Sequence, residues 1–98
     1  MLRAIAFCVD ELGRVAPFEA AAWVRIYERY LDTWVLVREL PHVRDLDFLA
    51  GCLAVVGESV GSRVRSELER SGIGVWELPG EPEDLAEVVW KEEERLAA

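Results

Sequence analysis

Apolar residues in the first half of the chain recur with the two-residue period of β-strands. Residues 2–9 are predicted to form a strand that is apolar on both faces, as is typical in the middle of a covered sheet. Residues 22–30 and residues 34–40 alternate between their two faces, and a short turn at residues 31–33 separates them. Because short connections favour antiparallel neighbours, these three strands are predicted to form an antiparallel meander.

The second half of the chain alternates between strand and helix patterns. Residues 53–56 form the continuous apolar run of a buried parallel strand, and residues 73–78 form a fifth short strand. Between them, Ser59 is predicted to cap a helix that runs to Ser71. A last helix opens at residues 81–84, where a proline and acidic side chains suit the first turn.

These elements predict one α/β domain over residues 1–98. Right-handed crossovers place strands four and five parallel beside strand one, which gives a mixed five-stranded sheet with the order 3-2-1-4-5. The sheet carries two to three helices, since residues 42–50 fit either a short helix or a packed loop. This is the layout of a ribonuclease-H-like motif.

The charge of the chain limits its partners. Nineteen acidic residues against eleven basic ones leave a formal net charge of −8, and Lys91 is the one lysine. Phosphate backbones are bound by lysine and arginine, so we expect neither nucleic acid nor a membrane as a partner. The apolar run at residues 4–9 is too short for a signal peptide or a membrane span. We therefore expect a cytoplasmic protein whose Cys8 and Cys52 stay reduced.

A pair of carboxylates suggests one enzymatic alternative. Asp10 and Glu58 follow strands one and four, whose ends are neighbours in the predicted sheet. Ribonuclease-H-like nucleases hold Mg²⁺ with carboxylates at such ends. The ordinary interpretation is a turn aspartate and a glutamate in the first turn of a helix. Because a nuclease also needs a third carboxylate and a basic groove, no catalytic residue is assigned.

A glycine-containing turn between strand four and the following helix is the predicted cofactor-binding site. Its candidate residues are Gly57, Glu58, Ser59, Gly61 and Ser62. Backbone N–H groups at a helix N-terminus can receive an anion, and ligands of open α/β sheets bind at the carboxyl ends of the strands. The turn lacks the spacing of nucleotide-binding loops, so an ordinary turn remains the alternative.

Cysteine and histidine supply the predicted metal ligands. Thiolate and imidazole suit iron–sulfur species. Cys8 lies inside strand one, so burial is expected to raise its pKa and leave it inert. Cys52 follows an irregular segment, where we expect water to reach its thiol. Cys52 and His42 are therefore the two predicted iron ligands. Cys52 and the glycine turn lie at opposite ends of strand four, roughly 13 Å apart, and are therefore competing sites.

Aromatic residues on strands two and three point to a second kind of partner. Trp23 and Trp34 fall on this hairpin, and strict alternation predicts Trp34, Leu36, Arg38 and Leu40 on one face of strand three. Cross-strand aromatic pairs stabilise hairpins on their own. Strand three is nevertheless an edge strand in the predicted sheet, and an exposed edge can pair with another protein or with a second copy of the chain.

Several segments together resemble a known family. They are Ile5–Val9, Cys52–Gly61, Glu67–Glu77, Gly80 with Pro82, and the tail Lys91–Glu94. In these segments the chain resembles the iron-only nitrogenase accessory protein family AnfO. More distantly, it is similar to the NifX and NafY proteins of dinitrogenase iron–molybdenum cofactor biosynthesis, which share the ribonuclease-H-like fold. The family has a longer helical segment before strand four, where this chain has only residues 42–51.

The resemblance implies a non-enzymatic accessory protein of nitrogenase. Such a protein binds an iron–sulfur cofactor, its precursor, a nitrogenase subunit or a cofactor-assembly protein. No ligand residue is transferred from the relatives, so Cys52, His42 and the glycine turn are candidates on their own chemistry. The alternatives are a protein-interaction module without a cofactor and a Mg²⁺-dependent nuclease.

Overall fold

The computed structural model describes residues 4–41 and 46–97. The strands are β1 (Ala4–Val9), β2 (Trp23–Tyr30), β3 (Thr33–Pro41), β4 (Ala54–Gly57) and β5 (Gly74–Glu77). The α-helices are α1 (Ser62–Arg70) and α2 (Pro82–Ala97), and short 3-10 turns form η1 (Phe18–Ala20) and η2 (Asp47–Leu49). None of the described helices is long and apolar enough to cross a membrane.

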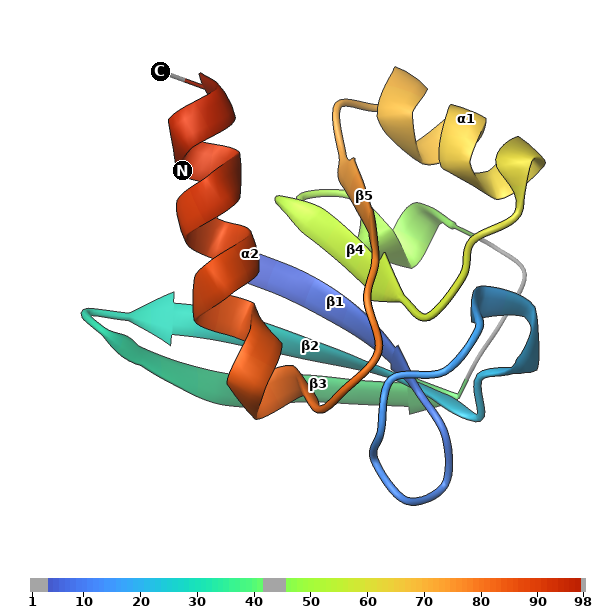
Figure 1. Cartoon of the computed structure of the whole chain (residues 1–98), viewed down its shortest axis with the longest axis horizontal. Coiled ribbons are helices and arrows are strands. Elements are labelled where there is room, and N and C mark those ends of the chain that lie inside the picture. Colours follow the sequence, from blue (N-terminus) through green and yellow to red (C-terminus); the bar gives the residue numbers. More distant parts are fainter. Residues whose placement is uncertain (1–3, 42–45, 98) are drawn as a thin grey trace.

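The five strands form one mixed sheet with the order β3-β2-β1-β4-β5, so the predicted α/β topology is confirmed. β1 pairs antiparallel with β2 and parallel with β4, and β5 lies parallel to β4. Within the sheet, β1 is the central strand, and Figure 1 shows the hairpin of β2 and β3 along one edge of β1 and the strands β4 and β5 along the other. The edge strands are therefore β3 and β5.

A core lies on each face of the sheet, as the two apolar faces of β1 predict. Ile5 and Phe7 pack toward α2, in a cluster that includes Val89 of this helix. Ala6 and Cys8 point the other way, into a cluster that includes Leu68 of α1. The two helices thus cover opposite faces, and β1 is buried between them.

A β-bulge makes the strict alternation predicted for β3 wrong. Ile26 of β2 pairs with Arg38, whereas the next residue, Tyr27, pairs with Leu36. Val37 is therefore an extra residue on β3 and packs against the α1-side cluster. An extra residue shifts the alternation by one, so the four-residue face predicted for this strand is split between the two sides of the sheet.

Helix α1 begins at Ser62, three residues after the predicted cap at Ser59. The main chain just before the helix instead bonds to the segment that precedes β2: the Phe18 N–H donates to the Ser59 carbonyl at 2.8 Å. Gly61 takes the capping position without a side-chain hydrogen bond. Gly72, which follows the helix, has a φ of +82°, the left-handed conformation that glycine adopts readily at the end of a helix.

The segment before β4 was predicted as a short helix or a packed loop. Residues 42–45 lie outside the described residues, and the described part contains the 3-10 turn η2. Leu49, at the end of this turn, is fully buried in the α1-side cluster. The turn therefore folds apolar side chains inward directly before β4.

Candidate functional site

The glycine turn predicted to bind a cofactor joins β4 to α1. Gly57 ends β4, Ser62 begins α1, and Glu58 and Ser59 are exposed between them. The Glu58 N–H donates to the Ala16 carbonyl at 2.9 Å. The turn is thus tied to the segment that precedes β2.

Two carboxylates of the same chain occupy further amides of this turn. The Val60 N–H donates to Oε2 of Glu77 at 2.8 Å, and the Gly61 N–H donates to Oε1 of Glu19 at 3.2 Å. Glu77 also pairs with Arg65 at 3.1 Å. The bond from Val60 and the neighbouring guanidinium lower the pKa of Glu77 below its usual range. An external anion that bound the Val60 or Gly61 amide would have to displace one of these internal carboxylates.

Both cysteines are buried in the core on the α1 side of the sheet. Cys8 has no exposed surface, as predicted, and burial followed by the nearby Glu19 raises its pKa to about 12. Cys52 is 3% exposed, so the expectation that water reaches it is wrong. Its N–H donates to the Leu49 carbonyl at 3.0 Å, and both residues belong to one apolar cluster. The turn η2 carries Cys52 inward, and burial raises its thiol pKa to about 11.

Neither thiol is expected to react readily in the native protein. Burial raises the pKa of both thiols, to about 11 at Cys52 and about 12 at Cys8, so very little of either is the reactive thiolate at neutral pH. Cys8 also has no exposed surface, whereas Cys52 is 3% exposed. Timed alkylation with mass mapping should therefore label Cys52 slowly, Cys8 more slowly still, and both quickly in denaturant. Faster labelling of Cys8 than of Cys52 in the native protein would contradict this order.

The structure gives no metal-ligand set within the part of the chain that it describes. His42, the second predicted ligand, lies outside the described residues. Across residues 4–41 and 46–97, no group of three or more His, Cys, Asp or Glu side chains is placed to hold a metal ion. Asp10 closes its own turn, because its Oδ1 accepts hydrogen bonds from the amides of Leu12 and Arg14 at 2.9 and 3.0 Å. The nuclease alternative gains no support from these residues.

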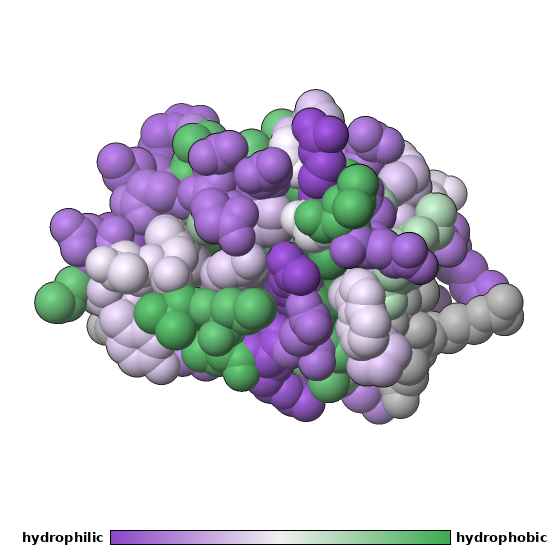
Figure 2. Space-filling view, turned by 90° about the horizontal axis from the view of Figure 1, so that it is seen from below, coloured by the Kyte–Doolittle hydropathy of each residue, from purple (hydrophilic) through white to green (hydrophobic). Residues whose placement is uncertain are grey.

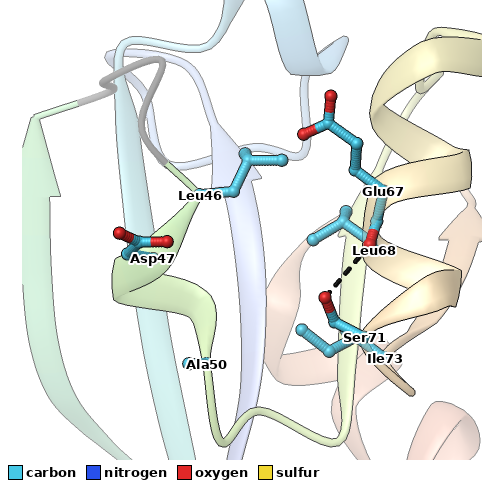
Figure 3. Close-up of a pocket in the computed structure, with 7 residues that line it drawn as sticks. All are labelled: Leu46, Asp47, Ala50, Glu67, Leu68, Ser71 and Ile73. Atoms are coloured by element: carbon cyan, nitrogen blue, oxygen red, sulfur yellow. Dashed lines mark hydrogen bonds between the residues drawn. The ribbon is translucent and has the colours of Figure 1, made fainter.

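A small pocket lies between η2 and α1, and sequence reasoning did not find it. Its volume is about 170 Å³, and its lining residues are Leu46, Asp47, Ala50, Glu67, Leu68, Ser71 and Ile73. Figure 3 shows that the two elements contribute facing walls, and each wall carries a carboxylate. The hydroxyl of Ser71 donates to the Glu67 carbonyl at 3.2 Å. The two acidic side chains disfavour an anionic ligand in this pocket.

Glu87 of α2 anchors the helix to the β2–β3 hairpin. Its two carboxylate oxygens each accept a hydrogen bond from Arg29 at 3.1 Å, and the Trp34 ring N–H donates to Oε1 at 2.8 Å. The Arg29 guanidinium also lies over the Trp90 ring, 3.8 Å from its centroid. Trp34 is therefore partly covered by α2, whereas Trp23, the other tryptophan predicted on this hairpin, is 37% exposed.

The Glu87 contacts make stability depend on pH. Hydrogen bonds from Arg29 and then Trp34 lower the pKa of Glu87 below its ordinary value of 4.5. A carboxylate whose pKa is lower in the folded state adds stability above the unfolded pKa, and this stability is lost as the pH falls through the folded pKa. Urea unfolding at a series of pH values should show a steeper loss below about pH 4.5 for the wild type than for Glu87→Gln. Parallel curves would contradict this role.

The outer edge of β3 exposes apolar side chains. Val35 and Leu36 are 42% and 44% exposed, and no described strand lies beyond β3. Figure 2 views the molecule from the side on which β3 lies in Figure 1, and an apolar patch stands out there between hydrophilic regions. Edge strands with exposed apolar residues are places where another strand can add.

The backbone of this edge is open near the hairpin turn. Tyr30 and Thr33 close a two-residue loop and are therefore a hydrogen-bonded pair. Hydrogen-bonded and non-hydrogen-bonded pairs alternate along an antiparallel ladder. The N–H and C=O groups of Trp34 and Leu36 consequently point away from β2, toward the outside of the sheet.

The remainder of β3 is protected. The bulge at Val37 interrupts the regular strand, and charged side chains follow at Arg38 and Glu39. The strand ends at Pro41, which has no N–H to offer. Bulges, charges and prolines are the usual protection of a sheet edge. We therefore define the open edge segment as residues 33–37.

Comparison with solved structures identifies proteins of the same fold. PH0822, known from a crystal structure, is similar with a TM-score of 0.71 and 15% identity over 91% of each chain. A putative NifB protein from Thermotoga (TM1290), which belongs to the DUF35 family and was solved by NMR, is similar with a TM-score of 0.61. It is 15% identical and matches 92% of this chain and 88% of its own. No protein-family model and no curated protein matches the sequence. The chain thus shares the fold of these two proteins.

Proposed function

We propose that this chain is a non-enzymatic accessory protein of nitrogenase that binds a protein component through the open edge segment. The component is a nitrogenase subunit or a cofactor-assembly protein. The sequence resemblance to the AnfO family supports the nitrogenase role, and the fold is shared with a protein described as a putative NifB. The observation that carries the proposal is the outward-pointing backbone of Trp34 and Leu36, which pairs with no strand in the described part of the chain and lies beside exposed apolar side chains.

The described residues favour a protein ligand over a cofactor. The turn amides of Val60 and Gly61 already bind the carboxylates of Glu77 and Glu19. Cys52 is 3% exposed inside an apolar cluster, so a cofactor could reach its sulfur only if this part of the core opened. The pocket beside η2 has acidic walls. An iron–sulfur cofactor therefore finds no preformed site among these groups.

The binding experiment uses purified nitrogenase components and purified cofactor-assembly proteins, each titrated against the chain. Val35→Lys places a charge on the open edge segment, while Val88→Lys makes the same change on α2, where Val88 is 59% exposed. We expect one component to bind the wild type and Val88→Lys equally, and to bind Val35→Lys at least ~10-fold more weakly. Failure of every component to bind, or equal binding of all three proteins, would overturn the proposal.

A second experiment separates protein binding from cofactor binding. The chain is mixed anaerobically with an isolated iron–sulfur cofactor, desalted, and assayed for iron and visible absorption. We expect no stoichiometric iron to be retained. Retention of iron that disappears in Cys52→Ala would instead establish the cofactor-holding alternative. Mg²⁺-dependent nuclease activity that is lost in Asp10→Asn would establish the enzymatic one.

A further inference from the structure

The open edge segment is complementary to itself. Its sequence, Thr-Trp-Val-Leu-Val, contains no charged residue. It begins directly after the hairpin turn and ends at Val37, the extra residue of the bulge. The outward-facing backbone groups belong to two residues, Trp34 and Leu36, with Val35 between them. This symmetric arrangement allows two copies of the strand to satisfy one another.

We propose that the free protein pairs with a second copy of itself through residues 33–37, as antiparallel strands centred on Val35. This inference rests on the proposed function in one respect: the pairing covers the same backbone groups that the protein component uses. Self-association would then hide the docking edge until a component competes for it.

Backbone hydrogen bonding selects this register. With Val35 opposite Val35, Trp34 lies opposite Leu36 of the second copy, so every outward-facing group of these two residues in both copies meets a partner. Centring on Leu36 would place Trp34 opposite Arg38, which belongs to the bulge and pairs with Ile26 of β2. Centring on Trp34 would place Leu36 beside the hairpin turn. Only the Val35 register uses both residues of each copy.

The side chains agree with the same register. Trp34 and Leu36 lie on the α2 side of the sheet, where they form a cross-strand aromatic–aliphatic pair. The two Val35 side chains face each other on the α1 side, and no charged residue enters the pairing. The formal charge of −8 on each chain opposes association, so added salt is expected to strengthen the pairing. Because the contact is only five residues long, it is expected to be weak enough for another strand to displace.

A disulfide at the centre of the pairing tests the register. In the expected arrangement Val35 forms a non-hydrogen-bonded pair with its counterpart, in which Cα atoms lie roughly 4.5 Å apart, within disulfide range. Val35→Cys should therefore give a covalent dimer under mild oxidation of the native protein. Thr33→Cys is the matched control, because its counterpart lies four residues along the strand, roughly 13 Å away. Cys8 and Cys52 are buried and should not contribute.

The outcomes separate this inference from the proposed function. Rapid dimer formation by Val35→Cys but not by Thr33→Cys, together with a wild type whose sedimentation depends on concentration, is the expected result. Equal cross-linking of the two variants, or a wild type that sediments as a monomer up to millimolar concentration, would overturn the pairing. A monomeric chain that still binds a nitrogenase component would leave the proposed function intact. A dimeric chain that binds no nitrogenase component would support the self-pairing and overturn the proposed function.

Discussion

Replacing Phe7 with alanine is expected to lower the free energy of unfolding by about 3–5 kcal/mol. Phe7 is fully buried on the central strand, and its ring meets Tyr27 edge-to-face with centroids 5.6 Å apart. The substitution removes apolar contacts on the α2 side and leaves a cavity beside this ring. Urea or guanidinium unfolding of the purified variant measures the loss.

The control is Leu12→Ala, at a residue that is 85% exposed in the loop after β1. We expect this variant to unfold within about 0.5 kcal/mol of the wild type. A loss below about 1 kcal/mol for Phe7→Ala would contradict the two-sided burial of β1.

The second large effect on stability is expected from substitution of one of two adjacent valines on α2. Val89 is fully buried between the helix and the sheet, whereas Val88 is 59% exposed. Val89→Asp places a carboxylate in an apolar cluster without a partner, which we expect to cost at least about 4 kcal/mol. For a domain of this size, such a loss lowers the melting temperature by roughly 15–30 °C or prevents folding.

Val88→Asp makes the same chemical change one residue earlier. It should shift the melting temperature by only a few degrees, since its carboxylate remains in water. Circular dichroism during heating measures both variants. Equal losses would mean that α2 presents a different face to the sheet.

The strand order followed from the sequence because it depends on local patterns. β1 is apolar on both faces, so its central position could be predicted from residues 2–9 alone. The short turn at residues 31–32 marks the hairpin of β2 and β3. The bulge at Val37 could not be predicted from the sequence, because it depends on the packing of the Val37 side chain against the α1-side core. A single extra residue then reversed the faces of Arg38 and Leu40.

The candidate site was harder to predict because its contacts join distant parts of the chain. The turn amides are occupied by Glu19, 42 residues before its partner Gly61, and by Glu77, 17 residues after Val60. No local pattern marks either pair. The burial of Cys52 likewise depends on η2, which lies within residues 42–50, a stretch whose sequence fits either a short helix or a packed loop. The exposed edge was predictable, since it follows directly from the strand order.

The anchoring of α2 by Glu87 was also missed. Arg29 and Trp34 pair across the hairpin, which the alternation of β2 and β3 already placed side by side. The sequence does not show where α2 crosses the sheet. This position decides which glutamate of α2 meets Arg29 and Trp34. Packing of Ala86 and Val89 against the central strands sets this position.

Hydrogen exchange of the chain with and without the nitrogenase component that we propose as its partner tests the central claim most directly. The amides of Trp34 and Leu36 point out of the sheet and should exchange quickly in dilute protein, where the chain is free. On binding the component, we expect these two amides to become protected, while those of the glycine turn at residues 57–62 and the pocket beside η2 change little. Protection at the turn or the pocket with no change at Trp34 and Leu36 would contradict docking through the open edge segment.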